Sequence, residues 1–319
     1  MNAAERVVRA IDGYQQRRRP LAFLFGVVKK FGDDRGGALA ALLTYYGFLS
    51  LFPLLLLLVT ALGFVVGNDP HLQQRLLHSA LTDFPIIGVQ IQSNIHALRA
   101  NGFGLAVGVV GLLWGALGIT QVGQHAMQEV WNVPGVQRPG FPVRLWRGLK
   151  LLGVLGLGVG ATSVLAGLGS QGTHASLTRV GLILASVPVN IGLFVVGFRV
   201  LTGPRVPLRD HVPGAVVAGA AWSGLQALGG YLVAHQLRHA SQVYGFFGVV
   251  LGLVSWIFLV AQITIYAAEV NAVRAQKLWP RSIVQPPLTA EDERALAAIA
   301  RREERRPEEK VEVTFEQDA

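Results

Sequence analysis

Long apolar runs alternate with short polar connections along this chain. The first run begins at Ala38, ends at Val66 and contains no charged residue. Because a bilayer core is crossed by roughly 20 helical residues, a run of this length predicts a transmembrane helix. Five further runs are long enough to span, at about residues 102–124, 149–169, 180–201, 212–234 and 245–270. The pattern therefore predicts an all-α, polytopic membrane protein with six transmembrane helices in one bundle.

The remaining segments are polar or amphipathic. Residues 1–37 are basic and suit a short helix on an anionic leaflet, and residues 67–101 predict two short interfacial helices. In the tail, Thr289 and Asp292 have the spacing of a capping box, and we expect a solvated helix with a frayed end after them. We therefore divide the chain into a basic N-terminal segment (1–37), a transmembrane domain (38–273) and a charged tail (274–319).

Lysine and arginine are unevenly distributed between the connections. The N-terminal segment, the second and fourth connections and the tail together hold 24 of the 28, and the other three connections hold 4. Since positively charged connections stay in the cytoplasm, this split predicts that both termini are cytoplasmic. The formal net charge of +9 is explained by topology, because the basic residues lie between apolar runs, and no nucleic-acid partner is expected.

Composition and motifs argue against an enzyme. The chain is 51% hydrophobic and only 15% charged, and it has no cysteine, which excludes disulfides, thiolate catalysis and cysteine metal sites. It contains no G-x-x-x-x-G-K-[ST], H-E-x-x-H or G-x-S-x-G motif. His71, His78 and His96 fall on an outer connection, away from RNA, so a nuclease is not expected. We predict no catalytic residues, no cofactor and no metal.

Pro53 interrupts the first apolar run and predicts a kink, because proline lacks the N–H that would bond the carbonyl near Leu49. In lipid, that carbonyl needs a neighbouring helix or Ser50 folded back onto it. Tyr45, Tyr46 and Ser50 place hydroxyl groups just before the kink. Two interpretations remain open: ordinary packing around a proline, or a bent helix that lines a cavity.

Small and polar residues form stripes inside the other runs. Glycines in the second run, and small residues at Gly156, Gly160, Ser163 and Gly167 in the third, predict close helix packing. The polar residues within these runs are Asn190, Gln226, Gln262 and Glu269. Two interpretations are equally open for them: they face a cavity or a polar partner, or they take part in ordinary packing between helices.

Two glutamates lie at the cytoplasmic ends of predicted helices, Glu129 after the second run and Glu269 in the sixth. The helix dipole and the anionic inner leaflet both oppose a glutamate there. We expect Arg199 to neutralise them, or Arg144 and Arg147 from the neighbouring connection, with Asn271 adding hydrogen bonds. The alternative is that each glutamate reaches water at the interface.

Three stretches resemble the YihY/virulence factor BrkB family of bacterial inner-membrane proteins. ALAALLTYYGFLSLFPLLLLL (38–58) resembles the first-helix signature, and AMQEVWNV (126–133), which holds Asn132, resembles the stretch after the second helix. Residues 243–273 are similar to the last helix, with Trp256, Glu269 and Asn271 at matching positions and Ala267 where glycine is frequent. The resemblance covers about residues 20–280.

The resemblance implies six transmembrane helices, cytoplasmic termini and a place in the bacterial plasma (inner) membrane. Members have carried the label ribonuclease BN, which is a misassignment, and some are linked to envelope integrity, virulence or lipid export. We therefore expect a transporter or exporter of a lipid-like or small amphiphilic substrate, in contact with membrane lipids. The alternative is a non-transporting membrane scaffold for envelope integrity. The candidate functional or structural residues are Tyr45, Tyr46, Ser50, Pro53, Glu129, Asn132, Asn190, Arg199, Trp256, Gln262, Glu269 and Asn271.

Overall fold

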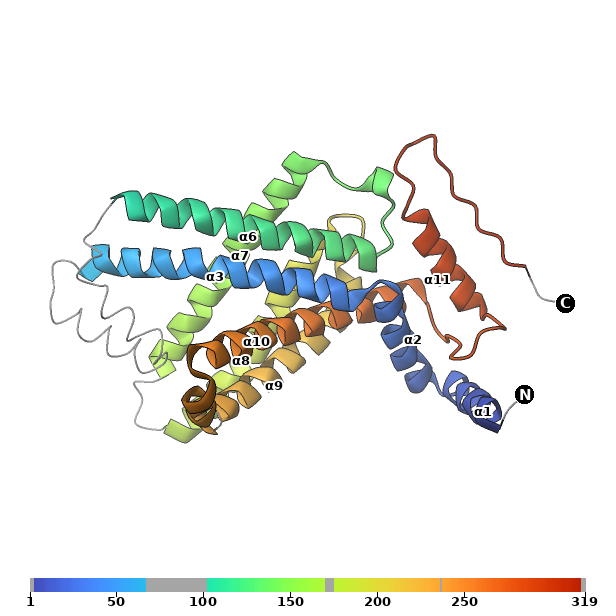
Figure 1. The fold of residues 1–319 in the computed structure, drawn as a ribbon, viewed down its shortest axis with the longest axis horizontal. Helices are drawn as coiled ribbons and strands as arrows, with labels where there is room; N and C mark the ends of the chain where they lie inside the picture. Colours follow the sequence, from blue (N-terminus) through green and yellow to red (C-terminus); the bar gives the residue numbers. More distant parts are fainter. Residues whose placement is uncertain (1–2, 67–101, 170–174, 236, 317–319) are drawn as a thin grey trace. The chain divides into compact units, whose positions relative to one another are not determined.

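The described part of the chain is helical in every long element. A computed structural model describes residues 3–66, 102–169, 175–235 and 237–316 (Figure 1). Its elements are α1 (Ala3–Arg17), α2 (Arg19–Asp33), α3 (Gly36–Val66), α6 (Gly102–Val130), η1 (Gly135–Gln137), α7 (Phe141–Gly169), α8 (Ala175–Thr202), η2 (Leu208–Asp210), α9 (Val212–His235), α10 (Leu237–Gln276) and α11 (Ala290–Arg301).

Each of the six apolar runs forms a helix, which confirms the all-α class. Within the described side chains, one stretch, Val250–Gln276 of α10, is long and apolar enough to cross a membrane, with a mean hydropathy of 2.0 over an 18-residue window. Shorter apolar stretches lie in α3, α8 and α9. Six spans therefore stay a prediction. The two interfacial helices expected within residues 67–101 lie outside the described residues.

Contacts divide the chain into two compact units. Unit 1 comprises Met1–Leu42, Thr120–Tyr231 and Phe258–Ala319, and unit 2 comprises Leu43–Ile119 and Leu232–Ile257.

In unit 2, glycines let α6 approach α3 closely. A Cβ on Gly115 would lie 3.0 Å from the backbone of Ser50, and one on Gly118 would lie 2.5 Å from the Tyr46 ring. The predicted packing role of this glycine stripe is confirmed at these two positions.

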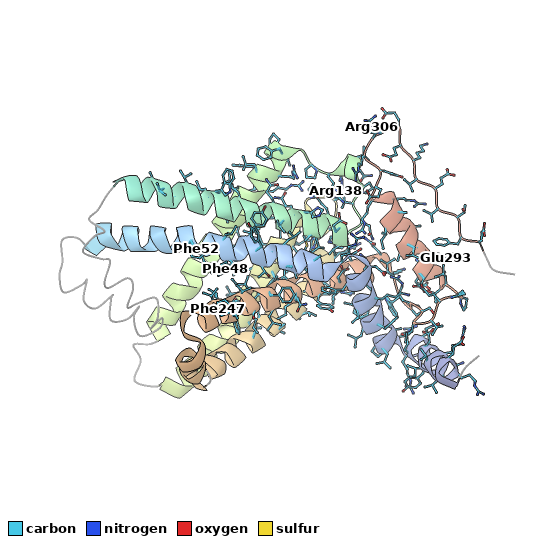
Figure 2. All side chains as sticks on the ribbon, in the orientation of Figure 1. Phe48, Phe52, Arg138, Phe247, Glu293 and Arg306 are labelled. Carbon is cyan, nitrogen blue, oxygen red and sulfur yellow. The ribbon has the colours of Figure 1, made fainter. Side chains whose placement is uncertain are left out.

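Large apolar side chains of unit 2 are exposed. Trp114 of α6 is 80% exposed and Phe247 of α10 is 64% exposed, and Phe52 of α3 is also exposed (Figure 2). Such surfaces are unfavourable in water and indicate contact with a membrane or with another apolar surface.

In unit 1, α7 packs against α8, and α9 packs against both α8 and α10. A Cβ on Gly158 would meet the Leu193 side chain, and one on Gly219 would meet Ile191. Among the described residues, no atom lies within 4 Å of the Cβ position of Gly156, which belongs to the predicted stripe of α7. The stripe that we predicted in α7 is therefore wrong at Gly156, and Gly158 makes the close contact instead.

Gly214 is the tightest of these contacts, so Gly214→Ala is expected to destabilise the protein. The added Cβ would lie 1.9 Å from the Ala267 carbonyl oxygen. Overpacking of this kind costs about 1–3 kcal/mol. Gly224 lies on the same helix, and no atom of the described residues lies within 4 Å of its Cβ position, so Gly224→Ala is the matched control. Thermal melts in detergent should show a lower midpoint for Gly214→Ala alone, and equal midpoints would contradict this packing.

The two ends of the chain fold together in unit 1. We call α1, α2, residues 277–289 and α11 the terminal assembly (Figure 1). Its small core contains Val27 of α2, Val273 and Leu278 at and beyond the end of α10, and Ala295 of α11. These contacts tie α11 to α2 and to the end of α10.

The predicted capping box of α11 is confirmed, because Thr289 and Asp292 each accept a hydrogen bond from the other's backbone N–H. The expectation of a solvated tail helix was wrong. Asp292 is completely buried and Ala295 is 1% exposed. The physical reason is the small apolar face of α11, which packs against α2 and the segment after α10.

Candidate functional site

Six charged side chains of unit 1 form a continuous series of ion pairs. They come from α2 and the residue after it, from α6 and the connection that follows, from α10, and from the residue after α11. We call this series the charge chain, and its order is Glu269, Lys30, Asp34, Arg302, Glu129 and Arg138. With three acids and three bases, its formal charge is balanced.

Lys30 is the centre of the buried half. Its Nζ lies 3.5 Å from Oε2 of Glu269, pairs with Asp34 and donates a hydrogen bond to the carbonyl oxygen of Val130 at 2.8 Å. The three side chains Lys30, Asp34 and Glu269 are each at most 1% exposed. The buried ammonium group of Lys30 on α2 therefore contacts both the end of α6, at Val130, and α10, at Glu269.

Arg302 connects this buried half to the partly exposed half. It donates to Asp34 at 2.9 Å and to the Glu129 carbonyl oxygen at 3.0 Å, and it lies 3.0 Å from the Glu129 carboxylate. Arg138, which lies in the connection after α6 (Figure 2), donates a hydrogen bond to the same carboxylate at 2.7 Å. Glu129 is thus held between two arginines.

Glu269 is the least satisfied member of the charge chain. It is completely buried, and among the described residues neither of its carboxylate oxygens accepts a hydrogen bond of ordinary geometry, although Lys30 and the carboxyl group of Asp34 lie beside it. Its nearest opposite charge, on Lys30, is at ion-pair distance. Because a buried charge with incomplete hydrogen bonding is costly, Glu269 is the strongest candidate for a functional group in this unit.

Arg199 does not pair with either glutamate, so the predicted partner was wrong. Its guanidinium donates to the carbonyl oxygens of Gly203, at 2.9 Å, and of Val206, just beyond the end of α8. Arg144 and Arg147 form no ion pair in the described structure either. The carbonyl groups beyond the C-terminus of α8 carry partial negative charge and attract a cation. They are closer to Arg199 in the sequence than either glutamate, and Arg199 bonds to them instead.

Asn271 also has a different role from the predicted one. Its Oδ1 accepts a hydrogen bond from the Gly214 N–H at 2.6 Å and thereby ties α10 to the start of α9. Asn132 lies just after α6 with a φ of 51°, a conformation that asparagine tolerates better than most residues. Its Nδ2 donates to the Gln276 side chain at 3.5 Å, which joins the ends of α6 and α10.

The hydroxyl groups of α3 belong to unit 2. The helix continues through Pro53, whose side chain lies outside the described residues, so the kink stays a prediction. Ser50 does fold back, but its Oγ donates to the Gly47 carbonyl oxygen at 2.7 Å and not to that of Leu49. Tyr45 is exposed and contacts the Tyr46 ring edge to face.

The other candidates are half-buried and stand outside the charge chain. Asn190 lies on α8, and Trp256 and Gln262 lie on α10. Their proposed functional importance stays a prediction. Within the described residues, no group of three or more His, Cys, Asp or Glu side chains is placed to hold a metal ion.

A second polar cluster lies inside the terminal assembly, and sequence reasoning missed it. Arg281 is completely buried, donates to Asp33 at 2.9 Å and also pairs with Asp292. Lys29 donates to Asp292 at 2.9 Å. Asp12 of α1 accepts hydrogen bonds from the Ile283 N–H and the Ser282 hydroxyl, both at 3.0 Å. The only sequence signal was the capping box, which placed Asp292.

The Asp12 carboxylate is expected to make the terminal assembly sensitive to acid. Burial alone would raise the pKa of Asp12, but hydrogen bonds from Ile283, Gln15, Gln16 and Ser282 outweigh it and lower the pKa from 3.8 to about 2. A carboxyl group whose pKa is lowered by folding stabilises the folded protein at pH values above its ordinary pKa. This stabilisation is lost as the pH falls towards the pKa of the group in the folded protein.

We therefore expect pepsin to release α1 progressively as the pH falls from 4 towards 2. In Asp12→Asn, release should be faster at pH 4 and should change less over this range. Identical pH profiles for the two proteins would contradict this role of Asp12.

Comparisons with known proteins agree with a membrane protein. A family model described as virulence factor BrkB matches residues 27–289. The chain is 25% identical to the inner membrane protein YhjD of Escherichia coli K12, over 83% of this chain and 85% of that protein. It is 23% identical to the UPF0761 membrane protein PBPRA3489 of Photobacterium profundum, over 91% of this chain and 92% of that protein. No solved structure matches the chain.

Proposed function

Because the chain belongs to the virulence factor BrkB family of membrane proteins, we propose that it is a six-helix protein of the bacterial inner membrane that transports a lipid-like or small amphiphilic substrate. In this proposal both termini are cytoplasmic, and the charge chain closes the cytoplasmic end of unit 1. The single observation that carries the transport proposal is the burial of Glu269 without a hydrogen bond to either oxygen.

An ion pair is not the most stable contact that could join α2 to α10. Apolar residues of similar volume would hold α2 against α10 at least as well as a buried ion pair. An under-bonded carboxylate is instead suited to a contact that must break and re-form, because its protonation or a change of partner alters the packing of two helices at once. Loss of the contact between Lys30 and Glu269 would leave the apolar contacts of Val27 and Phe31 with α10 in place and would let the two helices repack around them.

The alternative, a non-transporting scaffold, is favoured by a different observation. The terminal assembly joins both ends of the chain, because buried Arg281 pairs with Asp33 of α2 and with Asp292 of α11. Such a well-paired cluster is suited to a rigid platform. The two proposals differ in whether the membrane domain moves a substrate.

The transport proposal is tested with the full-length protein in vesicles. Fluorescent short-chain analogues of anionic, zwitterionic and single-chain lipids are loaded, and the label exposed outside is quenched with dithionite. We expect at least one analogue to cross the membrane faster in vesicles that contain the wild-type protein than in protein-free vesicles. Glu269→Gln should slow this by at least about tenfold, which corresponds to roughly 1.4 kcal/mol in the barrier.

Glu303→Gln is the matched control, because the Glu303 side chain is 72% exposed and pairs only with exposed Arg305 among the described residues. A thermal melt of each sample separates loss of folding from loss of transport. If no analogue moves faster than in protein-free vesicles, the scaffold is the better account. Reporter fusions test the topology: those after Gln171 and His239 should report outside, and those after Arg138, Arg205 and Gln285 inside.

A further inference from the structure

Two hollows in unit 1 share one arginine, Arg274, at the end of α10. The first has a volume of about 330 Å³ and is lined by Arg209, Asp210, Pro213, Asn271, Arg274 and Ala275. The second has a volume of about 340 Å³ and is lined by Arg19, Pro20, Phe23, Arg274 and Trp279. Neither hollow includes a member of the charge chain.

Asn271 lines the first hollow, but its side-chain amide is buried and does not open into it. The residue is 1% exposed, and its Oδ1 is occupied by the Gly214 N–H. Its Nδ2 has no hydrogen-bond acceptor within the described chain. Nδ2 is also closed to solvent, so the donors that a ligand in this hollow can reach belong to Arg209 and Arg274.

The charges around the first hollow favour an anion. Arg209 and Arg274 contribute two guanidinium groups, and Asp210 contributes one carboxylate, 3.8 Å from Nε of Arg209. The positive end of the α9 dipole adds to this excess. Pro213 lacks an N–H and the Gly214 N–H is occupied, so side chains rather than the helix backbone supply the donors.

The second hollow adds an aromatic wall beside the same arginine. Phe23 and Trp279 pack edge to face with ring centroids 5.9 Å apart, and Arg19 lies at this hollow as well. Aromatic rings next to cationic side chains are typical of surfaces that meet the boundary between lipid headgroups and acyl chains. A polar anion site and an apolar surface are thus joined at Arg274.

We propose that these two hollows form a binding site for a phosphate group, held by Arg209 and Arg274. Guanidinium groups suit phosphate because they donate two parallel hydrogen bonds to its oxygens. When the phosphate belongs to a lipid, the adjoining carbons lie against Phe23 and Trp279. This site is separate from the charge chain and needs no transport, so its failure and that of the proposed function are distinguishable.

The test measures binding to full-length protein in detergent micelles. The probes are dioleoyl phosphatidylglycerol, dioleoylglycerol, which has the same chains and no phosphate, and inorganic phosphate. We expect phosphatidylglycerol to bind at least about tenfold more tightly than dioleoylglycerol, as one charge-assisted hydrogen bond would provide. Arg274→Gln should lose about tenfold in affinity. Arg305→Gln removes an equal charge at a side chain that is 77% exposed and should bind as the wild type does.

Two outcomes support the site and identify the molecule that supplies the phosphate group. Competition by inorganic phosphate indicates a soluble phosphate compound, and binding of phosphatidylglycerol without such competition indicates a lipid headgroup. The proposal is overturned if Arg274→Gln binds as tightly as wild type, if dioleoylglycerol binds as tightly as phosphatidylglycerol, or if neither phosphate probe binds.

Discussion

Lys30→Met is expected to lower the free energy of unfolding by about 3–5 kcal/mol, the usual result of breaking a buried ion pair from one side. The substitution keeps an apolar stem of similar length and removes only the charge. Asp34 and Glu269 would then remain buried, with Arg302 as the one base still paired to Asp34 among the described residues. The hydrogen bond to the Val130 carbonyl oxygen would also be lost.

The measurement is a thermal or denaturant melt of the purified protein in detergent. Lys310→Met is the control, because Lys310 is exposed and its substitution should change stability by less than about 0.5 kcal/mol. If the two variants melted together, Lys30 would not hold a buried charge chain.

Arg281→Met is expected to cost a similar amount, about 3–5 kcal/mol, but its effect should be concentrated in the terminal assembly. Arg281 is completely buried and pairs with Asp33 and Asp292, so its loss removes the base paired with Asp33 and leaves Asp292 with Lys29 as its remaining base among the described residues. Hydrogen exchange should show faster exchange in α11 and residues 277–289, with α7 and α8 unchanged.

Arg294→Met provides the comparison for this prediction. Arg294 lies on α11 itself, but its side chain is 51% exposed and pairs with Glu291 at the surface. Exchange in α11 should change little in this variant. Equal acceleration in both variants would mean that Arg281 contributes no more than a surface arginine does.

Hydrophobic pattern was sufficient to predict the six long helices. The six apolar runs coincide with α3 and α6 to α10, and the capping residues Thr289 and Asp292 mark the start of α11. Both signals are local: they depend on residues a few positions apart in the chain. Residues a few positions apart largely determine where a helix begins and ends along the sequence.

The candidate site could be predicted only in part, because its pairing is not local. Glu129 and Glu269 were identified as charges that need partners, and the structure buries Glu269 completely. Their partners, Lys30 and Arg302, lie in segments that we interpreted as a surface helix and a solvated tail. A lysine in a basic segment carries no sign that it will be buried, since that depends on elements more than 200 residues away.

The most direct test of the account is a double-mutant cycle on Lys30 and Glu269, measured by melts in detergent. For Lys30→Met with Glu269→Gln, we predict a double variant more stable than the sum of the single losses implies, with a coupling energy of about 1–3 kcal/mol. Arg199→Gln with Glu269→Gln should be additive to within about 0.5 kcal/mol. Additive losses for the first pair, or strong coupling for the second, would contradict the assignment of Lys30 as the partner of Glu269.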